Sequence, residues 1–146
     1  MRYSELRKEG DFVLFHRYFD HPADGGRKLT QRSVFQVNGN SYFNLSIGTK
    51  YRDLPMFIGE FDLCYPDQYR SQSPFLFSAY AALQGFSGLT PWGTTLVTHK
   101  STYISPFTHG DDPVATGGDV QSYLMFMRED VSTAKNDLYL IYTPQK

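Results

Sequence analysis

Two runs of nearly continuous apolar residues stand out in the first half of the chain. Residues 11–15 read DFVLF, and residues 56–61 read MFIGEF directly after Pro55. Continuous apolar runs of this length are typical of strands buried on both faces, as in a parallel sheet. A short element over residues 88–93 closes on the single tryptophan, Trp92, and residues 137–142 (DLYLIY) predict a final strand.

Helical spacing is clearest over residues 73–84, where Ser73 is a favoured N-cap and Pro74 a favoured first helical residue. Gly85 follows at the left-handed position that often ends a helix. Two further helices are predicted over residues 42–50, after Ser41, and over residues 120–128, after Asp119.

Strands therefore alternate with helices along the chain, which indicates parallel βα units and the α/β fold class. A parallel sheet with so few buried strands rarely forms a stable domain alone. We therefore expect part of a larger α/β fold, or a half that must pair with another.

Polar and aromatic side chains follow the predicted strands at their carboxyl ends. In parallel βα folds these ends meet at one edge of the sheet, where active sites are built. A carboxylate held there by a rigid strand suits nucleophilic or acid–base chemistry. His16, Tyr18, Asp20 and His21 follow the first strand. The second strand ends in Glu60, which Asp62 and Tyr65 follow, and the third ends at Trp92.

Composition narrows the function classes. Aromatic residues make up 16% of the chain, with 12 Phe and 11 Tyr, which favours aromatic side chains facing a ligand groove. A net charge of −1 argues against nucleic-acid binding, and the lack of a long apolar run argues against a transmembrane helix. The N-terminal residues MRYSELRKEG are not expected to form a secretory signal.

Cysteine and histidine usage predicts neither a disulfide nor a metal or cofactor site. Cys64 is the only cysteine, so no internal disulfide forms, and a passive thiol is expected there. The four histidines are scattered at positions 16, 21, 99 and 109, without zinc-type spacing. Neither a G-x-G-x-x-G pattern nor a P-loop is found, so no nucleotide site is predicted.

Three segments together resemble the seventh βα unit of clan A glycoside hydrolases, most closely the β-galactosidase-like multidomain members. They are residues 58–61 (IGEF), 65–70 (YPDQYR) and 79–84 (AYAALQ). Residues 16–22 resemble the loop after the sixth strand of that family. Asp112-Pro113 and residues 126–131 resemble the last barrel helix and its exit, so the resemblance covers about residues 11–131.

The resemblance implies a partial (β/α)8 barrel over residues 1–131, about its last three βα units. Residues 132–146 would form a terminal strand or start a β domain. It implies a retaining hydrolase of β-linked sugars, such as β-galactosides or related polysaccharides, with carbohydrate as its ligand. The implied roles are nucleophile for Glu60, orienting groups for Tyr18 and His16, sugar platform for Trp92, and sugar contacts for Asp62 and Tyr65.

The chain departs from the family pattern in two respects. Retaining glycosidases use two carboxyl groups roughly 5–5.5 Å apart, and the family's acid/base is a Glu usually preceded by Asn. This sequence contains no Asn-Glu pair, and few residues precede the first strand. Asp67 and Gln72 stand where the family tends to have Asn and Glu. We therefore expect the isolated chain to carry the nucleophile without the acid/base, and to be inactive alone.

The residues also leave other interpretations open. The chain is alternatively a half-barrel that binds carbohydrate or serves assembly without catalysis, through self-association or with a missing N-terminal barrel half. A small α/β domain unrelated to glycosidases is a third interpretation. Taken singly, Glu60 fits a surface carboxylate, Trp92 a core residue and His21 a structural residue, and Asp62 and Tyr65 fit loop-structuring roles.

Overall fold

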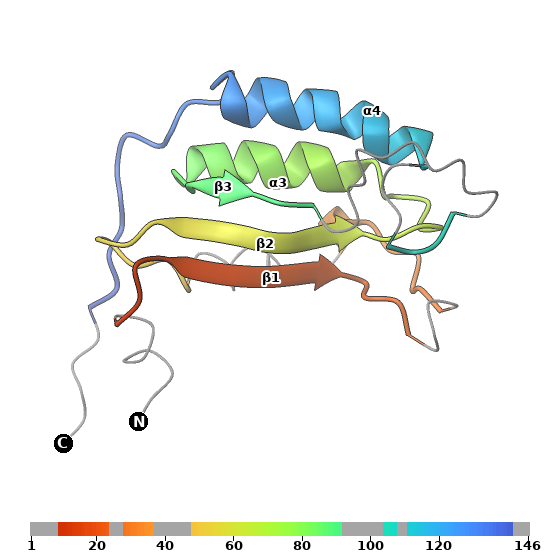
Figure 1. Cartoon of the computed structure of the whole chain (residues 1–146), viewed down its shortest axis with the longest axis horizontal. Helices are drawn as coiled ribbons and strands as arrows, with labels where there is room; N and C mark the ends of the chain where they lie inside the picture. The colour runs from red at the N-terminus through yellow and green to blue at the C-terminus, as the bar shows by residue number, and fades with distance from the viewer. Residues whose placement is uncertain (1–8, 24–27, 37–47, 92–103, 108–110, 142–146) are drawn as a thin grey trace.

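The computed structural model describes residues 9–23, 28–36, 48–91, 104–107 and 111–141. Its strands form one parallel sheet in the order β1-β2-β3 (Figure 1). The strands are β1 (Val13–Phe19), β2 (Met56–Leu63) and the two-residue β3 (Gly88–Leu89). The α/β class with parallel strands is thus confirmed, and membership of a (β/α)8 barrel stays a prediction.

Both helices lie on the same side of this sheet, and α3 lies between the strands and α4 (Figure 1). The helical segments are η1 (Val34–Gln36), α3 (Gln72–Leu83), α4 (Pro113–Ser122) and the π-helical turn η2 (Tyr123–Met127), which continues α4. α3 contacts β2, β3 and α4. The first turn of α3 approaches α4 closely, because Pro74 packs where Gly118 has no side chain.

The hydrophobic core lies between β1, β2 and α3. Its centre is the contact between Phe61 of β2 and Phe77 of α3, whose ring centroids are 4.4 Å apart. Each residue of this core is less than 10% exposed, so the burial of apolar surface fixes how α3 sits on the sheet. The cluster consists of Phe19, Met56, Ile58, Phe61, Leu63, Phe77, Ala81 and Phe86.

One irregularity in β2 decides which side chains face the core. Phe15 pairs with Ile58, but the next residue, His16, pairs with Glu60, so Gly59 is an extra residue. Such a β-bulge reverses the alternation of side chains beyond it. Met56 and Ile58 point to the core before the bulge, and Phe61 and Leu63 point there after it. Glu60 consequently lies on the face of the sheet opposite α3.

The two predicted buried strands exist, but their length and burial differ from expectation. β1 extends to Phe19, so His16 and Tyr18 belong to the strand rather than to a loop after it. The prediction that β1 is buried on both faces is wrong, because Leu14 is 50% exposed on the face opposite α3. β2 continues three residues beyond Glu60, to Leu63.

Two of the predicted helices exist, but both begin earlier than expected. The residue at the N-cap of α3 is Ser71, and the predicted cap, Ser73, is buried inside the helix. Gly85 has a φ of +62°, as predicted for the residue after the helix end. Asp112, not Asp119, caps α4, and its side chain accepts a hydrogen bond from the Val114 N–H.

The remaining predicted elements are either wrong or lie largely outside the described residues. The prediction of a final strand over 137–142 is wrong for the described residues 137–141, which are exposed and belong to no strand. A strand needs a neighbour to satisfy its backbone groups. The predicted helix over 42–50 lies outside the described residues except for 48–50, which are not helical. Trp92 also lies outside the described residues.

Candidate functional site

Glu60 is held between two side chains of the neighbouring strand. The Tyr18 hydroxyl donates a hydrogen bond of 3.0 Å to Oε2 of Glu60. Nδ1 of His16 lies 3.2 Å from Oε1 of the same carboxylate. His16 and Tyr18 both lie on the face of β1 opposite α3, and the bulge brings Glu60 to the same face. Each carboxylate oxygen therefore has its own partner on β1.

Gly59 makes room for this arrangement. A Cβ atom at residue 59 would lie 2.8 Å from Nε2 of His16 and 2.7 Å from Cδ1 of Leu14. Without a side chain there, the His16 ring can lie across β2 and reach Glu60. The histidine side chain is 47% exposed and the Glu60 side chain 23%, so the site is open to solvent on the His16 side.

Aromatic rings enclose Tyr18 on its other side. His21 lies edge-on to Tyr18 with centroids 5.2 Å apart, and Phe107 does so at 5.8 Å. Burial, followed by the hydrogen bond to Glu60 and its negative charge, raises the pKa of Tyr18 well above its usual range. Tyr18 therefore keeps its proton and remains a hydrogen-bond donor to Glu60 at neutral and moderately alkaline pH.

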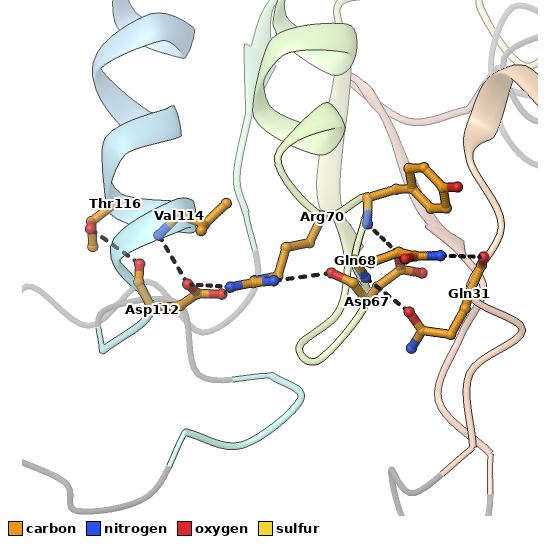
Figure 2. Close-up of polar contacts among 8 residues, drawn as sticks. Gln31, Asp67, Gln68, Arg70, Asp112, Val114 and Thr116 are labelled. Carbon is orange, nitrogen blue, oxygen red and sulfur yellow. Dashed lines mark hydrogen bonds and ion pairs between the residues drawn. The ribbon is translucent and has the colours of Figure 1, made fainter.

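A second polar network fastens the loop between β2 and α3 to the start of α4 (Figure 2). Arg70 donates to both carboxylate oxygens of Asp112, from Nε at 2.5 Å and from a terminal nitrogen at 3.3 Å. It also donates to the backbone oxygen of Asp67 at 3.1 Å. Because Asp112 is also the cap of α4, a single buried carboxylate joins the helix to the loop.

The same loop is joined to the segment after β1 through two glutamines (Figure 2). The Gln68 backbone N–H donates to Oε1 of Gln31 at 2.9 Å, and the Gln68 side chain donates to the backbone oxygen of Gln31 at 3.3 Å. The loops that follow β1 and β2 are thus tied together at the end of the sheet that carries the candidate site.

The other predicted site residues are placed differently. Asp62 and Tyr65 line a small pocket with Arg70 and Asp112, and Glu60 is not part of its lining. The Tyr65 ring also lies 5.4 Å from the Arg70 guanidinium carbon, which supports a structural role. Asp62 remains close enough to Tyr18 for its charge to contribute to the raised pKa.

Cys64 is fully buried next to the site. Burial first, and then the charges of Asp62, Asp67 and Asp20, raise the pKa of this thiol well above its usual range. A thiol rather than a thiolate is the stable form, so Cys64 is not an activated nucleophile.

Among the predicted site residues, the structure brings together His16, Tyr18 and Glu60. The sequence does not predict the ion pair between Arg70 and Asp112. The available signal was Asp112-Pro113, a favoured N-cap and first-turn pair, but the glycines at 117 and 118 weaken the helical pattern behind it.

No group of three or more His, Cys, Asp or Glu residues in the described ranges is arranged to hold a metal ion. Nor does any helix among the described residues have the length and apolar character to cross a membrane. Comparison with known protein families, curated proteins and solved structures finds no match.

Proposed function

We propose that this chain is the C-terminal part of a retaining glycoside hydrolase barrel and that Glu60 is its nucleophile. The observation that carries the proposal is the position of the Glu60 carboxylate. It lies on the central strand, on the face opposite the helices, with the Tyr18 hydroxyl hydrogen-bonded to one oxygen and Nδ1 of His16 3.2 Å from the other. A rigid, oriented carboxylate with an open side is what a displacement at a sugar carbon requires.

The arrangement of the strands supports the same proposal. Strands β1, β2 and β3 are parallel and neighbour each other in chain order, as successive strands of a (β/α)8 barrel do. Both helices lie on one side, which would be the outside of the barrel (Figure 1). The face with Glu60 would then look into the barrel, where side chains near the carboxyl ends of strands form the catalytic site.

In the proposed reaction, Glu60 attacks the anomeric carbon of a β-linked sugar. One carboxylate oxygen forms a bond to that carbon while the bond to the leaving-group oxygen breaks. A second carboxylic acid, expected from the missing part of the barrel, protonates the leaving oxygen. It then deprotonates the water that hydrolyses the glycosyl–enzyme ester. Tyr18 and His16 orient Glu60 for the attack.

Covalent trapping tests this proposal without the acid/base. A 2-deoxy-2-fluoro-β-galactoside with a dinitrophenolate leaving group needs no protonation to depart, and its fluorine slows hydrolysis of the ester. We expect the full chain to gain the mass of one fluorosugar, and peptide mapping to locate it on Glu60. Glu60→Gln keeps the shape of the side chain but removes the nucleophilic charge, and should not be labelled.

The matched control is Glu129→Gln, which changes an exposed carboxylate outside the site and should be labelled like the unchanged chain. Labelling of Glu60→Gln at the original rate, or no labelling of any variant, would overturn the nucleophile assignment. Turnover of ordinary aryl β-glycosides by the isolated chain, lost in Glu60→Gln, would instead show that the acid/base is present after all.

A second candidate function, assembly or sugar binding without catalysis, is favoured by one observation. Large apolar side chains are exposed near the site, with Phe12 at 54% and Leu14 at 50%. A half-barrel would bury this face against a second copy or an N-terminal half. A monodisperse dimer in size-exclusion chromatography, without covalent labelling, supports this function over the first.

A further inference from the structure

We infer that Asp67 is protonated in the folded protein and donates its O–H to the carboxylate of Asp20. This shared proton would act as a latch between the loop that follows β2 and the segment that follows β1. The latch involves neither Glu60 nor its partners, so it stands apart from the proposed glycosidase function.

Asp67 lies in the loop between β2 and α3 and is the proposed proton donor of the latch. Its side chain is completely buried. One carboxylate oxygen, Oδ1, accepts a hydrogen bond of 2.7 Å from the Tyr69 backbone N–H. The other, Oδ2, is buried and has no hydrogen-bond partner among the described residues. A buried carboxylate oxygen without a donor costs free energy, and a proton on it removes that cost.

Asp20 is the second side, directly after β1. Its Oδ2 accepts hydrogen bonds from the backbone N–H groups of Thr30, at 2.6 Å, and Gln31, at 3.0 Å. These two donors hold the Asp20 carboxyl in place at the end of β1. The Asp20 carboxyl also lies within hydrogen-bonding range of the Asp67 carboxyl. Two carboxylates have no hydrogen to share, so this contact becomes a bond only when one of them is protonated.

The surrounding charges favour Asp67 as the proton's location. Burial is the largest influence and raises the pKa of Asp67, and the charge of Asp20 raises it further. The Tyr69 N–H and the Arg70 guanidinium act in the opposite direction. Arg70, however, directs its side chain to Asp112 and reaches only the backbone oxygen of Asp67.

Two further titratable groups lie close by. The charges of Asp62 and Asp20 act on the buried Cys64 and help to raise its pKa, and Asp67 adds to this effect only when it is ionised. Cys64 is therefore a neutral neighbour of the latch and adds no positive charge that could replace the proton.

The consequence for stability follows from the raised pKa. The folded protein binds the Asp67 proton more tightly than the unfolded chain, whose Asp pKa is about 3.9. Stability contributed by the proton is complete below that pH and is lost as the pH rises through the folded value. Above it, two negative carboxylates face each other, and the hydrogen bonds between Gln31 and Gln68 should loosen.

The test is an NMR titration of the side-chain carboxyl carbons of the full chain. We expect Asp67 to titrate above an ordinary aspartate, because burial and the neighbouring Asp20 charge raise its pKa. In Asp20→Asn, which offers an amide donor in place of a second charge, the Asp67 midpoint should fall toward the ordinary value. In Asp67→Asn, the amide replaces the proton, and the Gln31 and Gln68 amide signals should no longer shift with pH.

Asp112 provides the internal control, since it should titrate below the ordinary range in the same spectra. A midpoint for Asp67 at or below that of an ordinary aspartate would overturn the inference. An unchanged raised midpoint in Asp20→Asn would overturn it as well, because burial alone would then hold the proton. None of these readouts depends on sugar binding or labelling at Glu60.

Discussion

Replacing Gly118 with alanine tests how tightly α3 and α4 pack. A Cβ atom at residue 118 would lie 2.1 Å from Cγ and 2.8 Å from Cβ of Pro74. Unstrained carbon atoms sit roughly 3.5–4.0 Å apart, so one of the helices must shift by more than about 1 Å. Pro74 is a buried ring in the first turn of α3 and has no flexible end that could move aside. Overpacking of this kind typically costs about 1–3 kcal/mol.

Gly117 offers a matched control one residue earlier in the same helix. A Cβ atom there meets no other atom within 4 Å. Both substitutions gain helix propensity of about 1 kcal/mol, so this gain cancels when the two variants are compared. We expect Gly117→Ala to be more stable than the unchanged protein and to exceed Gly118→Ala by about 1–3 kcal/mol.

Urea unfolding followed by circular dichroism measures this difference. The slope with denaturant should stay constant, because neither change alters the surface exposed on unfolding. A difference of 1 kcal/mol should appear as a shift in melting temperature of about 4 °C. Equal stability of the two variants, or a more stable Gly118→Ala, would refute the close contact between α4 and the first turn of α3.

Two further predictions concern the polar sites. Asp112→Asn removes the charge that Arg70 binds and should cost about 1–3 kcal/mol at neutral pH, measured by urea unfolding. Burial opposes the ionised form of Asp112, but the Arg70 hydrogen bond and the Val114 N–H outweigh it and lower its pKa. The difference between the variant and the unchanged protein should therefore shrink as the pH falls below about 4, and a pH-independent difference would contradict this explanation. Gly59→Ala should displace the His16 ring from Glu60 while costing only about 1 kcal/mol, because the atoms in its way are the ends of half-exposed side chains. The measurement is the NMR signal of the His16 ring, and unchanged signals would contradict the crowding at Gly59.

Much of the secondary structure follows from local pattern. The apolar runs around residues 13 and 56 predict β1 and β2, although Leu14 within the first run is half exposed. The position of Gly85 after α3 follows from the left-handed backbone that ends many helices. These features depend on residues that are close together in the sequence, so the local pattern is enough to predict them.

The failures depend on contacts between distant residues. Residues 137–141 have the composition of a strand, but strand formation requires a partner edge that periodicity cannot reveal. The first turn of α4 is stabilised by Asp112, and Arg70 binds that carboxylate from 42 residues away. Local propensity across Gly117 and Gly118 gives no sign of this support.

The candidate site combines both kinds of information: a local signal at Gly59 and contacts between residues that are distant in the sequence. A strand with strict alternation would place Glu60 with Met56 and Ile58, in the apolar core between the sheet and α3. An unpaired carboxylate there would be strongly destabilising. The extra residue at Gly59 moves Glu60 to the opposite face, where Tyr18 and His16 can reach it. A lone glycine inside a strand is the local signal of such a bulge. The orientation of Glu60 is thus a property of the backbone at Gly59, and any chemistry proposed for this carboxylate depends on that bulge.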